Sequence, residues 1–164
     1  MTIVKEKFPK LPPGYNDMNE VVRVVTNPEK TNLSMFFKFL SLEAEKTSEK
    51  DKNNKKIKVG SLLEIVSCSF WATEQALLKI NFPEKANYAH EENLAKSLFS
   101  LSYKSVMTFL LLLEKRLEKI YIDRYNTNQI SEATCFSVAI NFIHQSTMEM
   151  QKVWKICEEH TEEI

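Results

Sequence analysis

Three histidines are the residues in this sequence best suited to acid–base or metal chemistry: His90, His144 and His160. A carboxylate-bridged metal pair in a helical bundle uses Glu-x-x-His motifs, which place a carboxylate and an imidazole on the same helix face. The residues three places before the histidines are Asn87, Asn141 and Cys157. The sequence therefore predicts no metal pair of this type.

The cysteines give a second set of possible metal ligands. Cys157 and His160 are three residues apart and would share a helix face, which is half of a zinc site. No second Cys/His pair completes the site, and Cys157 continues an apolar stripe, so we interpret it as a buried thiol. Cys68 and Cys135 also lie among apolar residues. An odd number of widely spaced cysteines argues against a disulfide framework and favours a reducing, cytoplasmic location.

Nucleophilic and phosphate chemistry find little support. His144 could act as a general base toward a hydroxyl or thiol on another helix, but it lies beside an apolar stripe, where histidine more often packs. The two glycines, Gly14 and Gly60, cannot form a phosphate-binding loop or a dinucleotide fingerprint. We therefore predict a non-enzymatic protein without metal or cofactor. A cryptic enzyme or an apolar-ligand-binding bundle is kept as a further alternative.

A lysine-rich segment holds the densest positive charge of the chain: Lys50, Lys52, Lys55, Lys56 and Lys58. These side chains could contact RNA or DNA phosphates or an acidic partner. The segment has no arginine and no aromatic residue, so it lacks the bidentate and stacking contacts of specific recognition. Lys+Arg and Asp+Glu are equal at 22 each, without the basic surplus typical of nucleic-acid binders. We interpret the segment as a solubilising linker and keep nucleic-acid binding as the alternative.

Apolar helix surface is in surplus. Phe36, Phe37 and Phe39 crowd one and a half helical turns, and they cannot all face inward unless that helix is flanked on two sides. The segment 109–113 is apolar around its whole circumference, which is typical of a central helix. Either at least five helical elements surround this helix, or another protein or a second copy, for example in a homodimer, covers part of the surface. The three phenylalanines are a possible interface. Trp71 and Trp154 are interpreted as core residues, although tryptophan is also common at interfaces.

The elements that must position these residues are helices. The chain contains neither glycine nor proline from residue 84 to its end, and turn-rich β folds need both. We predict an all-α bundle of four to five helices in which the last two are long and antiparallel. The predicted helices begin near Asp17, at Asn27-Pro28-Glu29, at Ser61 with a capping box, at Pro83-Glu84 with a break near Asn87, and after Asn126-Thr127-Asn128.

The domain organisation follows from length and composition. With 164 residues, the chain fits one helical domain at 16–164, preceded by an extended, proline-containing arm at 1–15. The polar stretch at about 46–59 predicts a flexible Lys-rich linker within that domain. The longest apolar run, Val106 to Leu113, is too short to span a bilayer, so no membrane partner is expected.

One internal similarity links two helix starts. The segment Pro28-Glu29-Lys30-Thr31-Asn32-Leu33 resembles Pro83-Glu84-Lys85-Ala86-Asn87-Tyr88. A duplicated helical hairpin could produce it, but the similarity fades downstream. We therefore favour chance reuse of good helix-start chemistry.

Together these observations predict a small cytoplasmic adaptor, inhibitor or regulatory subunit that binds another protein or itself. A helical subunit of a nucleoprotein complex, using Lys50 to Lys58, is the alternative.

Overall fold

The computed structural model describes residues 11–162, with side chains for residues 11–159. This part of the chain contains no strand and six helices: α1 (Met18–Thr26), α2 (Leu33–Asn53), α3 (Ile57–Leu77), α4 (Ala89–Phe99), α5 (Tyr103–Asn126) and α6 (Ile130–Glu162). The all-α prediction is confirmed. Residues 11–162 form six helices rather than four to five, because the region after the predicted start at Pro83-Glu84 forms two helices, α4 and α5.

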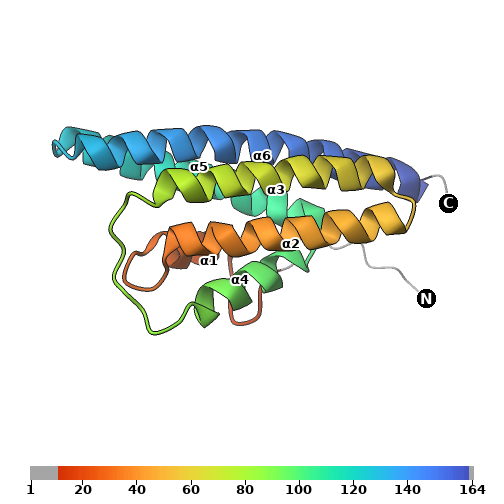
Figure 1. Cartoon of the computed structure of the whole chain (residues 1–164), viewed down its shortest axis with the longest axis horizontal. Coiled ribbons are helices and arrows are strands. Elements are labelled where there is room, and N and C mark those ends of the chain that lie inside the picture. The colour runs from red at the N-terminus through yellow and green to blue at the C-terminus, as the bar shows by residue number, and fades with distance from the viewer. Residues whose placement is uncertain (1–10, 163–164) are drawn as a thin grey trace.

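The four long helices α2, α3, α5 and α6 lie along a common axis (Figure 1). Helix α3 packs between α2 and α6, and α6 packs against α5, with neighbouring helices antiparallel. The two long C-terminal helices are therefore antiparallel, as predicted. Because α3 and α5 run in the same direction, the chain between them must return along the bundle. That crossover contains α4, which packs on α2, while α1 packs on α5.

Phenylalanine rings from different helices meet in the core. Phe36 on α2 packs against Phe109 on α5 with ring centroids 5.8 Å apart, and Phe37 lies 5.8 Å from Phe70 on α3. Phe36 and Phe37 are fully buried, and Phe39 is half-buried against the core. The prediction of an interface at these residues is therefore wrong for Phe36 and Phe37. The reason is that α3 lies on one side of α2 and α4 on another, so α2 buries more than one face.

The region predicted as a flexible linker at about 46–59 is mostly helical, so that prediction is wrong. Helix α2 continues to Asn53 and α3 begins at Ile57. The reversal is made by Lys55, which adopts the left-handed conformation (φ 65°) that glycine or asparagine usually supplies at a helix end. The Lys56 N–H donates to the Asp51 carbonyl at 2.7 Å, which satisfies one of the last carbonyls of α2.

Two side-chain contacts hold this polar end of α2 in place. The Tyr103 hydroxyl at the start of α5 donates to Asp51 Oδ2 at 2.8 Å. The Ser48 hydroxyl donates to the Gly60 carbonyl at 2.5 Å, where α2 and α3 approach closely. Because Asp51 and Ser48 are buried, these contacts anchor a sequence that has few apolar residues.

The helix starts agree only partly with the sequence. Asp17 caps α1 through a bond from the Asn19 N–H, and α6 begins after the 127–129 turn, both as predicted. Asn27 instead forms a turn, in which its Oδ1 accepts the Glu29 N–H, and α2 starts six residues later behind Asn32. Helix α3 begins at Ile57 rather than Ser61.

The segment after Pro83 also differs from the prediction. Residues 81–88 form a loop, and α4 begins only at Ala89. The break falls at residues 100–102 rather than near Asn87. There Ser102 caps α5 by accepting the Ser105 N–H. Sequence reasoning missed this serine cap between two apolar helices.

The predicted arm at 1–15 falls mainly outside the described residues. Within its described part, Pro12 is buried, and Leu11 and Tyr15 pack against the hydrophobic core. The end of the arm thus folds back on the bundle.

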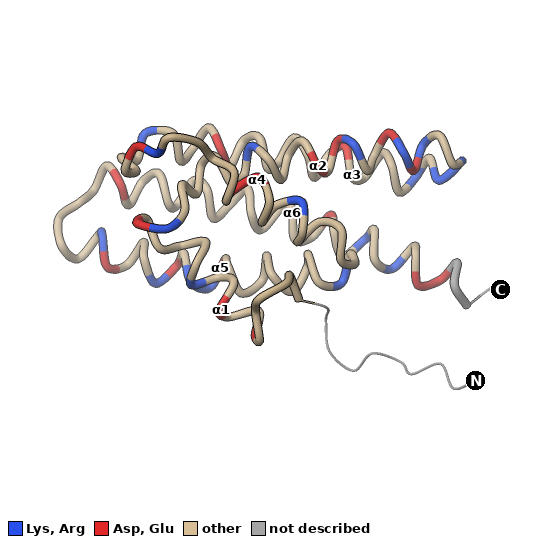
Figure 2. Tube along the Cα trace, turned by 90° about the horizontal axis from the view of Figure 1, so that it is seen from below, with Lys and Arg blue, Asp and Glu red and all other residues tan. Residues whose placement is uncertain are grey.

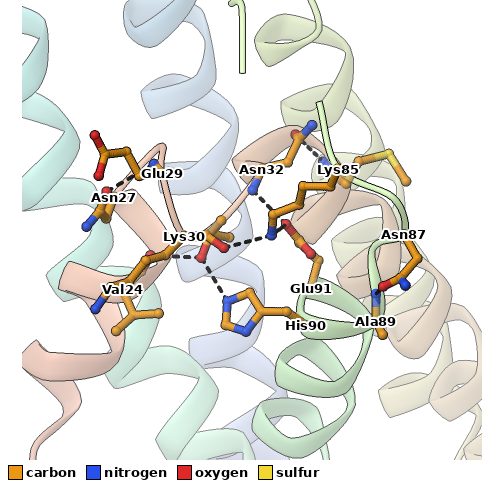
Figure 3. Close-up of polar contacts among 12 residues, drawn as sticks. Val24, Asn27, Glu29, Lys30, Asn32, Lys85, Asn87, Ala89, His90 and Glu91 are labelled. Carbon is orange, nitrogen blue, oxygen red and sulfur yellow. Dashed lines mark hydrogen bonds and ion pairs between the residues drawn. The ribbon is translucent and has the colours of Figure 1, made fainter. Parts of the chain in front are cut away.

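The two similar segments noted in the sequence meet around a buried carboxylate (Figure 3). Glu91 on α4 is fully buried, and its Oε2 accepts the Asn32 N–H at 2.8 Å and the Lys85 ammonium at 2.6 Å. The same ammonium donates to the Lys30 carbonyl at 2.7 Å. The α1–α2 loop and the crossover are therefore held together by one charged group.

A neutral contact extends this junction to α1. The Thr31 hydroxyl donates to the Val24 carbonyl at 2.8 Å, and His90 Nε2 lies 3.0 Å from the same hydroxyl oxygen. Because the hydroxyl has a single proton, we assign the proton of the second bond to His90 Nε2. His90 is thus a structural residue that joins α4 to the α1–α2 loop.

The ionisation of Glu91 reflects two opposing effects. Burial alone raises the pKa of this carboxyl group, but the hydrogen bonds from Lys85 and from the Asn32 N–H favour the charged form. Their sum lowers the pKa below its ordinary value. The carboxylate is therefore ionised at neutral pH inside the bundle.

Replacing Gly60 by alanine should destabilise the fold. A Cβ atom there would lie 2.8 Å from the Ser48 carbonyl oxygen and 2.5 Å from Lys52 Cγ, and the backbone atom cannot move aside easily. We expect G60A to lower the free energy of unfolding by about 1–2 kcal/mol, even though alanine favours helix. Urea denaturation measures this value. The control S61A, at the exposed neighbouring position, should be neutral or slightly stabilising. A G60A protein as stable as the wild type would contradict the close approach of α2 and α3.

The Glu91 junction predicts a pH-dependent effect of E91Q. The pKa of Glu91 is lower in the folded than in the unfolded chain. Its stabilisation is therefore complete above the unfolded pKa, about 4.3, and is lost as pH falls through the folded value. We expect E91Q to be less stable than the wild type by about 1–3 kcal/mol at neutral pH. The difference should shrink between about pH 5 and pH 3.

Urea denaturation of both proteins across this pH range gives the difference directly. E92Q is the matched control, because Glu92 is the neighbouring residue and forms an exposed pair with Lys96. It should change stability little. A wild-type advantage over E91Q that is independent of pH would show that the charge of Glu91 does not stabilise the fold.

Candidate interaction surface

The outward face of α3 and its C-cap residue carry large apolar side chains that are about half exposed. Trp71 is 57% exposed, Ile65 49% and Leu78 54%. A tryptophan left in water is uncommon, since its large apolar surface favours burial. The interpretation of Trp71 as a core residue is therefore wrong, whereas Trp154 is half-buried.

Trp71 borders a groove of about 520 Å³ between α3 and α6, named here the Trp71 groove. The groove is lined by Trp71, Ala72, Gln75, Ala76, Lys79, Thr134, Cys135, Val138 and Phe142. Figure 1 shows α3 and α6 side by side along their length. Because the two helices are antiparallel, Trp71 and Phe142 lie toward one end and Lys79 and Thr134 toward the other. The lining residues Ala72 and Ala76 are one helical turn apart, and their short side chains leave room on the α3 side of the groove.

This face is almost free of charge. No Asp, Glu, Lys or Arg occurs from Ala133 to Met148 on α6. Between Ile65 and Leu78 on α3, the one charged residue is Glu74, which is buried toward α2, where Ser34 donates to its carbonyl. Burial raises the pKa of Glu74, an effect that nearby Lys38 partly opposes. Elsewhere on the bundle acids and bases alternate, as at the α2–α3 turn in Figure 2.

A second, polar groove lies on the other side of Trp71, between α2 and α3. Its lining includes Ser41, Ser67 and the ion pair between Lys52 and Glu64, whose nitrogen and oxygen are 2.5 Å apart. The Ser41 hydroxyl donates to the Ser67 carbonyl at 2.9 Å, which joins the two helices. Trp71 thus forms a ridge between a polar groove and an apolar one.

The five lysines predicted as a possible contact for nucleic acid or an acidic partner lie around the α2–α3 turn, but they face different surroundings. Lys50 lines a separate depression of about 780 Å³ with Tyr103 and Trp154. Lys52 is ion-paired, and Lys55 makes the turn. Lys56 and Lys58 are exposed at the start of α3. The structure does not gather these five side chains into one groove.

The residues considered for catalysis or metal binding are dispersed. His144 Nδ1 lies 3.0 Å from Glu114 Oε1 between α6 and α5, and the side chain is exposed. The Cys157 thiol is half-buried, and burial raises its pKa, while the side chain of His160 lies outside the described residues. Among the residues that the structure describes, no three His, Cys, Asp or Glu side chains are grouped as a metal site.

Sequence reasoning missed the Trp71 groove, although one signal was available. On a helical wheel, Ile65, Cys68, Trp71, Ala72 and Leu78 fall on the face that also holds Glu64 and Lys79. The charged residues at both ends mark that face as the exposed one. The apolar residues between them are then on the surface.

Comparison with models of protein families, with curated proteins and with solved structures found no significant match. Within residues 11–162, no helix combines the length and hydropathy needed to cross a bilayer.

Proposed function

We propose that this chain is a non-enzymatic interaction module that binds an amphipathic helix of a partner protein in the Trp71 groove. The observation that carries this proposal is Trp71 itself, 57% exposed beside an apolar groove in which Lys79 is the one charged lining residue. Tryptophans in such settings often dominate binding energy, because covering them removes a large apolar area from water.

The shape of the groove favours a helix as the bound element. Two antiparallel helices form its walls, and the small side chains Ala72 and Ala76 leave space between Trp71 and Phe142. An incoming helix could pack there as a third helix with apolar residues at i, i+3 and i+4. The partner would be an adaptor target or a regulated protein, and a second copy of this chain would be a homodimeric form of the same contact.

The cytoplasm remains the proposed location. Cys68, Cys135 and Cys157, all in the described part of the chain, form no disulfide. A reducing compartment is compatible with that state.

Nucleic-acid binding through Lys50 to Lys58 has less support as a function. Lys52 is engaged by Glu64, and the buried Asp51 lies in the same segment. The Trp71 groove is lined by one cation, Lys79. An enzymatic role has less support still, because the described partner of His144 is Glu114 rather than a hydroxyl or thiol.

A charge placed in the groove should abolish partner binding. Val138 lines the groove and is 41% exposed, so V138D can be tolerated by the fold while placing a carboxylate in the apolar contact. We expect V138D to weaken binding at least about 100-fold, as expected for burying an unpaired charge in an interface. Wild-type and variant proteins immobilised in equal amounts would be compared for partner capture from the native host, followed by native mass spectrometry.

L111D is the matched control, because Leu111 is 44% exposed on α5, away from the groove. It should capture the same protein as the wild type. If V138D and L111D both lose partner capture to the same extent, or both retain it, the groove is not the binding site. A wild-type homodimer that V138D alone converts to a monomer would identify a second copy as the bound partner. Nucleic acid in the captured complex, unaffected by V138D, would instead support the lysine-rich segment.

A further inference from the structure

All three arginines of the chain lie around one groove. The sequence has 22 Lys and Arg residues together, of which Arg23, Arg116 and Arg124 are the arginines. Arg116 and Arg124 are both on α5, and Arg23 is far from them in sequence. All three line the same depression of about 520 Å³, where the end of α1 and the loop after it meet α5. Lys119 lines it as well. Lysine is the usual base everywhere else in this protein, so the arginines mark a particular chemical requirement at this position.

The favourable interaction of a positive charge with the helix dipole does not explain why these residues are arginine rather than lysine. Arg23 and Arg124 occupy the last turns of α1 and α5, where a positive charge interacts favourably with the helix dipole. The last turns of α2 and α4 meet the same need with lysines. Arg116 lies in the middle of α5, away from both helix ends. What distinguishes arginine is its planar guanidinium, which binds carboxylates or phosphates through two parallel hydrogen bonds.

Arg124 is held by carboxylates of the described residues, whereas Arg23 and Arg116 are available to bind a ligand. Arg124 Nε donates to Glu132 Oε2 at 3.0 Å, and its Nη1 donates to Asp123 Oδ2 at 2.7 Å. No hydrogen bond or ion pair with any residue in the described part of the chain holds the guanidinium of Arg23 or Arg116. Both side chains are exposed, as is Lys119. Four cations line the groove against one carboxylate, Asp123. Even with Glu132, which pairs with Arg124 but does not line the groove, positive charge is in surplus and faces solvent.

We infer that this groove, named here the arginine groove, binds an acidic protein segment through its Asp or Glu carboxylates. No aromatic side chain lines it, so it lacks the stacking surfaces that single-stranded nucleic acids use. Pro28 and Ile120 give it apolar edges that suit a peptide backbone and its side-chain stems. Arg23 and Arg116 bind the carboxylates, and Lys119 adds a point charge.

The arginine groove is separate from the Trp71 groove. Figure 2 shows α1 and α5 on the side of the bundle away from α2 and α3. The two sites can therefore be occupied at the same time, one by an apolar helix and the other by an acidic segment. This inference does not depend on the proposed function of the Trp71 groove.

The arginine side-chain Nε–Hε signals in ¹H–¹⁵N NMR spectra test the inference in the full-length protein. The probe is a blocked oligoglutamate peptide, with an oligothymidine of equal length and inorganic phosphate as comparison ligands. We expect the peptide to shift the Arg23 and Arg116 signals in a saturable manner, with weaker effects from the other two. R116Q should weaken peptide binding about tenfold, as expected for the loss of one bidentate pair.

Two further variants separate specific recognition from general charge. K115Q removes a charge from the adjacent exposed position, which does not line the groove, and should change the affinity less than about twofold. R116K keeps the positive charge but removes the planar guanidinium that makes two parallel hydrogen bonds. It should bind the peptide more weakly than the wild type does. Equal weakening by K115Q and R116Q would overturn the inference, as would an absence of saturable binding. If the protein binds oligothymidine more tightly than the peptide, the groove is a nucleic-acid site, and the inference of an acidic protein segment is overturned as well.

Discussion

A single buried carboxylate constrains the path of the chain around the bundle. Glu91 is the group at which the α1–α2 loop, the crossover and α4 meet, through the Asn32 N–H and the Lys85 ammonium. A charge inside a protein is tolerated only when hydrogen bonds replace its lost hydration. Since its other oxygen, Oε1, has no hydrogen-bond partner among the described residues, the two bonds at Oε2 must supply this compensation. Any shift of either loop would break one of them, and the two loops are therefore held in one relative position.

The position of the crossover decides which faces of the bundle remain open. Helix α3 and helix α5 run in the same direction, so 25 or so residues must connect opposite ends of the bundle. Fixed by Glu91, this connection covers α2 with α4 and leaves the outer sides of α3 and α6 uncovered. Helix α1 covers part of α5 and creates the arginine groove at its own end. The open Trp71 groove thus follows from where the crossover runs, and the arginine groove follows from where α1 packs on α5.

The fold class and the long C-terminal hairpin could be predicted from the scarcity of glycine and proline and from helical periodicity. The α2–α3 hairpin could not, because a lysine rather than glycine makes the left-handed turn, and because Asp51 finds its partner, Tyr103, far along the chain. The candidate site was missed for a related reason. Apolar residues on α2 and α3 look alike in sequence, but tertiary packing buries Phe36 and Phe37 and exposes Trp71. Similarly, nothing local brings Arg23 next to Arg116.

Site-specific photo-crosslinking can show whether the Trp71 groove contacts a partner in the cell. Gln75 is exposed and lines the groove, so a benzoylphenylalanine at this position would point toward a bound helix. The same residue introduced at Leu111 on α5 reports on an unrelated face. Irradiation in the native host should give a discrete protein crosslink from position 75 and none from position 111. Crosslinks of equal yield from both positions, or from position 111 alone, would show that the Trp71 groove is not the binding site.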